Sequence, residues 1–277
     1  MSQYTSSLYS PKKDKRMDEQ TPQSPILLAL AGIGIEVYPV HAQFLSQKLA
    51  GYGAQDLPAD APWISVRMSP EDIYAEKEYE AVILANYGLK VPDYEDGYFE
   101  MVSLFRKLLD RMLDWNIIYM HGSAVCIDGS GVLFTAPSGT GKSTHARLWR
   151  EHFKDRVVVI NDDKPLIRIS GDGIFVCGNP WNGKHGIGCQ MEAPLRAVVR
   201  LRRGQTNSVR PVDTLEAMRD LYKATFHFQE KEKMQKVLPL LGDIMINVPC
   251  CRMDCTMDPE AAEVSYAGIA EALQLRI

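Results

Sequence analysis

The 277-residue sequence predicts an α/β fold, and three stretches carry that prediction. A strand-like run, Gly131–Thr135, leads through a glycine-containing turn into a helix-compatible segment that starts near His145. A second apolar run, residues 157–160, is rich in β-branched side chains and is typical of a strand buried on both faces. Residues 96–115 repeat apolar side chains at the i, i+3, i+4 spacing of an amphipathic helix. Strands alternating with helices indicate an α/β domain.

Three regions follow from these patterns. Residues 1–24 are polar after Tyr9 and predict a flexible N-terminal arm. Residues 25–115 predict a small mixed α+β region, in which residues 25–37 form a strand with a glycine-marked bend and residues 81–84 form a strand. Residues 116–277 predict the larger domain.

The turn after Thr135 has the pattern of a P-loop, which binds the phosphates of nucleoside triphosphates. Gly139 and Gly141 let successive backbone N–H groups converge on a polyphosphate, and the following helix adds its positive end. Lys142 supplies a charge for the β- and γ-phosphates, and Ser143 offers a hydroxyl to Mg²⁺. Ala136 replaces the first glycine of the pattern, but the flanking strand and helix favour the motif over a chance turn. The expected nucleotide-binding residues are Ser138, Gly139, Thr140, Gly141, Lys142, Ser143 and Thr144.

Two carboxylates, Asp162 and Asp163, end the strand of residues 157–160. In an open α/β sheet, the C-terminal ends of the strands are where ligands bind. One carboxylate could hold the metal ion that bridges the phosphates, and the other could accept the proton of an attacking hydroxyl. A solvated turn is the alternative, and the nearby P-loop favours the functional interpretation.

Four segments, in this order, resemble the core shared by HPr (phosphocarrier protein) kinase/phosphorylases and ATP-dependent phosphoenolpyruvate carboxykinases. They are Met120–Ala124, Gly131–Phe134, Ser138–Thr144 and the Asp162-Asp163 pair. In both families a His-bearing strand precedes the P-loop strand, as His121 does here. The resemblance covers about residues 117–200.

The resemblance implies a role for each matching residue. Lys142 would contact phosphates, and His121 would reach the metal ion or the γ-phosphate. Ser143 and Asp163 would bind the metal, and Asp162 would act as the base, although the two aspartates could exchange these roles. The expected catalytic residues are therefore Asp162, Lys142 and His121.

Departures from both families leave the phosphoryl acceptor open. HPr kinases usually have Glu after the Gly-Lys-Ser, whereas this chain has Thr144, as the carboxykinases do. The Arg-Gly-Leu-Gly-Ile run of HPr kinases is absent, and residues 179–188 stand near its place. Carboxykinases are much longer, and their oxaloacetate-binding arginine region has no counterpart here.

The predicted activity is an ATP- and Mg²⁺-dependent kinase. It would transfer the γ-phosphoryl group to a serine-like hydroxyl on a protein, a peptide or a small metabolite. One alternative is a nucleotide-hydrolysing or nucleotide-sensing P-loop switch that has no acceptor. Another is a carboxykinase-like lyase, which would need an arginine-lined pocket for a dicarboxylate.

Two polar segments beyond the acidic pair are further candidates. The loop of residues 179–188 is either an ordinary connector or a cover over the phosphates with Lys184 or His185 pointing inward. Arg202 and Arg203 follow the strand of residues 197–201, where a guanidinium could neutralise phosphate charge, although such pairs are more often solvated. The remaining elements expected are a hairpin over 165–177, helices over 213–226, 231–241 and 259–275, and a strand over 244–255.

Composition limits the partners and the compartment. A net charge of −4 argues against a general nucleic-acid binder. We expect a cytoplasmic protein with no membrane partner, because no run of 18 or more apolar residues and no secretory signal is evident. The six cysteines form no C-x-x-C pair, so buried thiols are favoured over a metal cluster at Cys250, Cys251 and Cys255. A homo-oligomer is left open.

Overall fold

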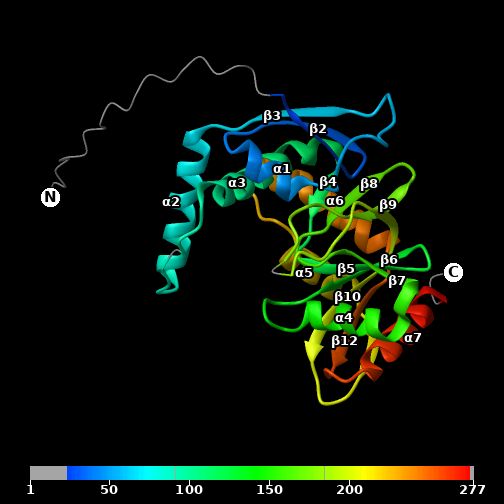
Figure 1. The fold of residues 1–277 in the computed structure, drawn as a ribbon. Coiled ribbons are helices and arrows are strands. Elements are labelled where there is room, and N and C mark those ends of the chain that lie inside the picture. The colour runs from blue at the N-terminus through cyan, green and yellow to red at the C-terminus, as the bar shows by residue number, and fades with distance from the viewer. Residues whose placement is uncertain (1–23, 91, 184, 275–277) are drawn as a thin grey trace, which may run out of the picture.

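The computed structural model describes residues 24–90, 92–183 and 185–274, and it begins with a small three-stranded sheet (Figure 1). Strands β1 (Ile26–Leu30) and β2 (Ile33–Tyr38) are antiparallel, and β3 (Trp63–Arg67) pairs with β2 in parallel. The single bent strand expected over residues 25–37 is therefore wrong. Ala31 and Gly32 have φ of 51° and 79°, and two left-handed residues in succession reverse the chain into a hairpin. Helix α1 (Ala42–Leu49) follows β2.

Residues 81–84 are helical, so the strand expected there is also wrong. They belong to α2 (Pro70–Asn86), which begins with a capping box between Ser69 and Asp72 and with Pro70 in its first turn. These start signals initiate a helix that runs through the apolar residues. The run remains on the surface, since Val82 is 61% exposed.

The amphipathic helix expected over residues 96–115 is confirmed as α3 (Asp96–Met112), followed by a 3-10 turn over Leu113–Trp115. Its apolar face, with Leu104 and Leu108 fully buried, packs in one core with β1, β2 and β3. The same core includes Leu166 and Trp181, so it reaches the larger sheet.

The larger sheet has the strand order β4-β8-β9-β10-β6-β5-β7, and a short branch of β12 and β11 joins it at β10. Its strands are β4 (Ile117–Tyr119), β5 (Gly122–Ile127), β6 (Ser130–Thr135), β7 (Val157–Asn161), β8 (Leu166–Ser170), β9 (Gly173–Cys177), β10 (Glu192–Arg203), β11 (Ser208–Pro211) and β12 (Cys250–Cys255). The hairpin expected over residues 165–177 is confirmed by β8 and β9.

Helices cover both faces of this sheet (Figure 1). On one face, α4 (Lys142–Phe153) and α7 (Glu260–Gln274) pack through Trp149 and Ala262 against β6 and β10. On the other, α5 (Thr214–Ala224) and α6 (Lys231–Asn247) pack through Leu221 and Leu241. The expected helices are confirmed, but residues 244–247 continue α6, so the last strand begins only at Cys250. The hydrophobic repeat of α6 extends to the buried Ile244.

Strand β7 departs from the prediction of burial on both faces. It is the edge strand beside β5, and Val158 is 41% exposed. The apolar run predicted burial on both faces, but at the edge of the sheet the side chain of Val158 is left open to solvent. Among the described residues, no helix combines the length and apolar character needed to cross a membrane.

Candidate phosphate-binding and phosphoryl-transfer site

The strand directions bring the predicted site residues to one edge of the larger sheet. Strand β5 lies between β6 and β7 and is antiparallel to both, so β6 and β7 run parallel to each other. The C-terminal ends of β6 and β7 therefore lie beside the N-terminal start of β5. These three chain ends carry the glycine-rich loop, the Asp162-Asp163 pair and His121, respectively.

The loop between β6 and α4 has the backbone form that a phosphate-binding turn needs. Gly139 and Gly141 have φ of 74° and 117°, in the left-handed region that glycine adopts without steric cost. No atom lies within 4 Å of a Cβ built on Gly139, so the space above the loop is open. Helix α4 begins at Lys142, directly after the loop, and no side chain in the described part of the chain caps its first N–H groups.

Lys142 and His121 are in direct contact at this edge. The Lys142 ammonium donates to Nε2 of His121 at 2.9 Å and to the carbonyl oxygen of Ala136 at 3.2 Å. Because an ammonium group can only donate, Nε2 is the acceptor and the ring proton sits on Nδ1. That nitrogen faces Oδ1 of Asp163 at 3.4 Å. The three side chains form one chain of contacts.

Burial controls the charge of this pair. Desolvation lowers the pKa of Lys142, opposed by the nearby Asp163 and Asp162. Desolvation and the Lys142 charge lower the pKa of His121, with Asp163 opposing. His121 is therefore neutral near pH 7 and can accept a hydrogen bond from Lys142.

The two aspartates have different partners. The buried Asp162 accepts a hydrogen bond from the Ser123 hydroxyl at 2.5 Å. Asp163 pairs through Oδ2 with the ammonium of Lys164 at 2.5 Å. Asn161 orients the turn, because its Oδ1 accepts from the backbone N–H of Asp163 at 2.9 Å and of Lys164 at 2.7 Å.

A cavity of about 260 Å³ lies between the first turns of α4 and the acidic turn. Ser143 lines it from α4, Asp162 from the end of β7, and His185 from the loop after β9. The Ser143 hydroxyl and one carboxylate of the pair thus line a shared space. Lys184, the other candidate of that loop, lies outside the described residues.

The loop of residues 179–188 is fixed to the acidic turn. The buried Asn179 donates to the carbonyl oxygen of Lys164 at 2.6 Å, and Asn161 donates to the carbonyl oxygen of Asn179 at 3.0 Å. A Cβ on Gly183 would lie 3.0 Å from the carbonyl oxygen of Asp162, so the loop passes close to the pair. Ser123, Asn161 and Asn179 were not among the individually predicted site residues. Ser123 lies beside His121 in the quoted motif and Asn161 directly precedes the pair, whereas Asn179 carries no local signal.

The two arginines after the strand of residues 197–201 differ in what they contact. Arg202 pairs with Asp254 at 2.5 Å on the surface. Arg203 donates to the carbonyl oxygen of Gly139 at 2.6 Å and so reaches the glycine-rich loop. Both belong to β10, which pairs with β6 in parallel, so Arg203 ends at the same edge as the loop.

A second cavity, of about 560 Å³, adjoins the loop on the other side of α4. Its lining includes Gly139, Thr144 and Leu148 on one side, and Arg203 and Met257 on the other. The volume is in the range of small-molecule sites. It is therefore large enough for a nucleoside.

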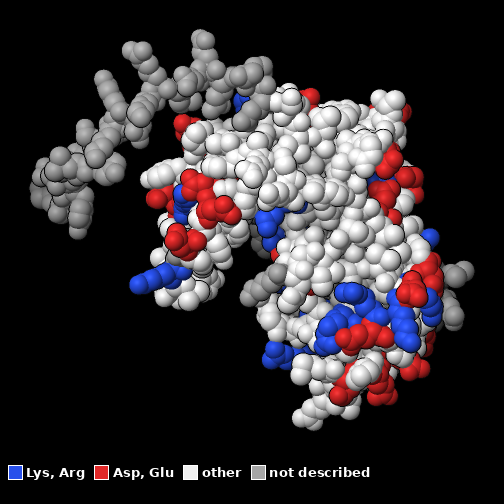
Figure 2. Space-filling model, in the orientation of Figure 1, with Lys and Arg blue, Asp and Glu red and all other residues white. Residues whose placement is uncertain are grey.

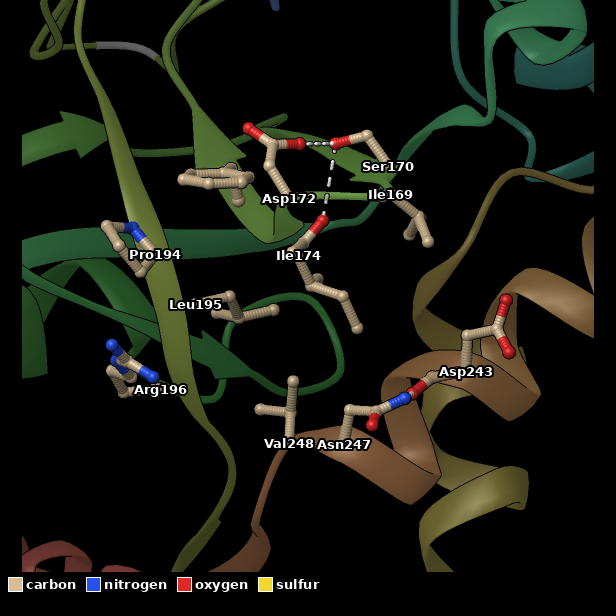
Figure 3. A pocket seen from close by; sticks show the side chains of 13 residues that line it. Ile169, Ser170, Asp172, Ile174, Pro194, Leu195, Arg196, Asp243, Asn247 and Val248 are labelled. Atoms are coloured by element: carbon tan, nitrogen blue, oxygen red, sulfur yellow. Dashed lines mark hydrogen bonds between the residues drawn. The ribbon is translucent and has the colours of Figure 1, made fainter.

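A cavity of about 500 Å³ lies away from this edge, between the turn of the β8–β9 hairpin and α6 (Figure 3). Its polar side chains are exposed, and the Ser170 hydroxyl lies within hydrogen-bond distance of Asp172 and of the carbonyl oxygen of Gly173. None of the predicted site residues lines it. The cavity therefore lies outside the predicted site.

The cysteines form no metal centre within the described part of the chain. Cys250 and Cys251 are buried and Cys255 is partly exposed. No group of three or more His, Cys, Asp or Glu side chains in residues 24–90, 92–183 and 185–274 is arranged to hold a metal by itself.

No protein-family model and no curated protein sequence matches this chain. Among solved structures, it is similar to the Hpr(Ser) kinase/phosphatase from Coxiella burnetii, with 12% sequence identity and a TM-score of 0.37. The match covers 57% of this chain and 91% of that chain. A similarity this weak assigns no function, so the residues of this chain carry the proposal that follows.

Proposed function

We propose that the protein is an ATP- and Mg²⁺-dependent kinase that transfers the γ-phosphoryl group to a hydroxyl on a protein, a peptide or a small metabolite. One observation carries the proposal. The glycine-rich loop, His121 and the Asp162-Asp163 pair meet at one sheet edge, where β6 and β7 end and β5 begins. Phosphoryl transfer needs this combination, because its catalysis is positioning and charge neutralisation around a polyphosphate.

The nucleotide would lie across the N-terminus of α4. Loop N–H groups and Lys142 hold the phosphates, and the open space above Gly139 accommodates them. The nucleoside occupies the cavity of about 560 Å³, beside Leu148 and Arg203.

The donor set fits Mg²⁺, which prefers hydroxyl and carboxylate oxygens and keeps several waters and substrate phosphates as ligands. Ser143 and Asp163 are the proposed protein ligands, with His121 beside Asp163 at 3.4 Å. When bound, the ion neutralises charge between the β- and γ-phosphates. One or two carboxylates suffice for such a site, so the absence of a three-residue cluster among the described residues is compatible with it.

Asp162 is the proposed base. Its Oδ1 is held by Ser123, which fixes the carboxylate, and the side chain lines the cavity that Ser143 also lines. A base in this position withdraws the proton of the acceptor hydroxyl as the phosphoryl group moves. Asp162 and Ser143 line the same cavity, so the two aspartates could also exchange roles. In that case Asp162 would bind the metal ion and Asp163 would be the base.

Asp162→Asn tests the proposal and separates the two allocations. Asn keeps the shape of Asp162 and can still accept from Ser123, so ATP binding should be unchanged. Turnover should fall by about 10²–10⁴-fold, the usual contribution of a general base. The assay is transfer from γ-labelled ATP to a metabolite and peptide extract. An Asp162→Asn protein with full activity would remove Asp162 from the mechanism.

A Mg²⁺ titration assigns the roles within the pair. If Asp163 binds the metal, Asp163→Asn raises the Mg²⁺ concentration needed for half-maximal activity and Asp162→Asn does not. The reverse result supports the exchanged allocation. Phosphate release with no labelled acceptor in the extract would instead favour the nucleotide-hydrolysing switch.

A further inference from the structure

Helix α2 carries an apolar surface that the fold leaves uncovered. It extends away from the rest of the molecule (Figure 1), and its tertiary packing is mainly with α3. Only Ile73 and Glu76, both in its first half, are buried. From Glu78 to Asn86 no side chain is buried. A helical segment of this length is marginal in water without packing, so its second half needs a partner.

The exposed side chains follow the spacing of a helix–helix interface. Ala75, Tyr79, Val82, Ile83 and Asn86 are all exposed, and we call this set the α2 seam. The steps from residue 75 to 79, 82 and 86 are four, three and four, which keeps one stripe facing a partner helix. Ile73 faces α3 from a different side of the helix, whereas Glu76 and Tyr79 lie at the border between the two sides and both contact Arg106 of α3. The seam therefore points to an additional helix outside this chain's own fold.

We propose that the α2 seam binds the α2 seam of a second copy of this chain, forming a two-fold homodimer. Within the seam, Tyr79, Val82 and Ile83 are 45%, 61% and 39% exposed. Just after the helix, Tyr87 and Leu89 are 77% and 59% exposed. Together these side chains present roughly 500 Å² per copy, given the size of aromatic and aliphatic side chains. Two copies bury about 1,000 Å², the size at which specific interfaces begin.

Charge selects an antiparallel arrangement. In the first half of α2, Asp72, Glu76 and Lys77 pair with Lys107, Arg106 and Asp96 of α3, which leaves the exposed Glu71 and Glu78, whereas Lys90 lies just beyond the free end of the helix. Figure 2 shows acidic side chains with basic groups among them along the upper part of this helix, and a basic side chain near its lower end. An antiparallel pair centred on Val82 brings each acidic half near the partner's basic end. A parallel pair would place acidic halves side by side, which is unfavourable.

The N-terminal arm of this chain is a poorer occupant. Residues 1–24 are mostly Ser, Thr, Lys, Asp, Glu, Gln and Pro, with large apolar side chains only at Met1, Tyr4, Leu8, Tyr9 and Met17. A segment of this composition offers little apolar surface to cover the seam. A second copy instead offers a surface of the same size and spacing, as a two-fold interface requires.

Sedimentation velocity on the full chain, from about 1 to 100 μM, tests the interface. We expect a dimer whose dissociation constant rises at least tenfold in Val82→Glu, because two buried carboxylates would meet near the two-fold axis. Ala85→Glu is the matched control, since it adds the same charge to an exposed position on another side of α2. A wild-type monomer at 100 μM, or equal effects of the two variants, would overturn the proposal. Circular dichroism checks that both variants stay folded.

Disulfide trapping tests the arrangement. In the antiparallel dimer, Val82→Cys cross-links to its own copy under mild oxidation, whereas Ala75→Cys, away from the axis, does not. A parallel pair would cross-link at both positions and would overturn the antiparallel assignment. The wild-type protein provides the background from the native cysteines. These readouts are independent of kinase activity.

Discussion

His145, on the buried side of α4, should make the stability of the protein depend on pH. Its side chain is 2% exposed, and its ring packs edge-on against Phe134 with ring centroids 4.7 Å apart. Its Nε2 lies 3.1 Å from Oγ of Ser265. That hydroxyl donates to the carbonyl oxygen of Ala262 at 2.9 Å and accepts from Nε1 of Trp149 at 2.7 Å. Ser265 has one proton, so His145 must be the donor.

The tautomer follows from this network. The proton of neutral His145 sits on Nε2, and Nδ1 is buried without a hydrogen-bond partner in the described structure. Protonation would place a charged N–H group there with nothing to accept it. Burial accordingly lowers the pKa of His145 from 6.5 to about 4.

The sign and size of the effect follow from that shift. The unfolded chain binds a proton near pH 6.5, whereas the folded chain resists it until about pH 4. The contribution to stability is therefore complete above pH 6.5 and is lost as the pH falls toward 4. Near pH 4, the difference between the two pKa values lowers the free energy of unfolding by about 3 kcal/mol relative to pH 7.

Urea denaturation followed by tryptophan fluorescence at pH 7 and pH 4 measures this loss. His145→Phe is the comparison, because Phe keeps the ring packing and Ser265 retains Trp149 as a partner. The wild type should lose about 3 kcal/mol more than the variant between these pH values. His121, whose pKa is also lowered, is present in both proteins and cancels. Equal losses, or an NMR titration of His145 near pH 6.5, would refute the reasoning.

Three further predictions concern single contacts. Lys142→Met should raise the pKa of His121, because the Lys142 charge helps to lower it, and histidine NMR titration measures the shift. Arg203→Ala should raise the KM for ATP about fivefold, because the loop loses the hydrogen bond that Arg203 donates to the carbonyl oxygen of Gly139. The control is Arg202→Ala, which breaks only the ion pair with Asp254 and should leave the KM for ATP unchanged. Glu100→Ala should cost about 3 kcal/mol in urea denaturation, because the fully buried carboxylate accepts from the backbone N–H groups of Val40 and His41; a loss below 1 kcal/mol would contradict this.

Local sequence signals predicted the parts of the fold that depend on neighbouring residues. The strand, turn and helix around Gly139 and Gly141 were predicted because glycine spacing and the flanking periodicity lie within about twenty residues. The amphipathic helix α3 followed from its own repeat. Helix α2 was missed because residues 81–84 are a short apolar run, and such a run predicts a strand if it is assumed to be buried. The exposed Val82 shows that no core of this chain requires that run.

The contacts that complete the site could not be predicted, because they join distant segments. Asn179 reaches Lys164 from the far side of the β8–β9 hairpin, and Arg203 reaches Gly139 across 64 positions of sequence. Neither contact leaves a pattern in the local sequence, because each depends on which strands become neighbours in the sheet. The pairing of β10 with β6 decides that Arg203, and not Arg202, meets the loop.

The position of His121 depends on the direction of a single strand. In a parallel sheet, ligands bind beyond the C-terminal ends of the strands, yet the candidate His121 precedes β5. It reaches the site because β5 is antiparallel to both of its neighbours, so its beginning lies beside their ends. The chain enters β5 close to β6, because a Cβ on Gly122 would lie only 2.8 Å from the carbonyl oxygen of Phe134. The His-Gly step thus places an imidazole beside Lys142 where a parallel β5 would have carried it to the opposite edge of the sheet.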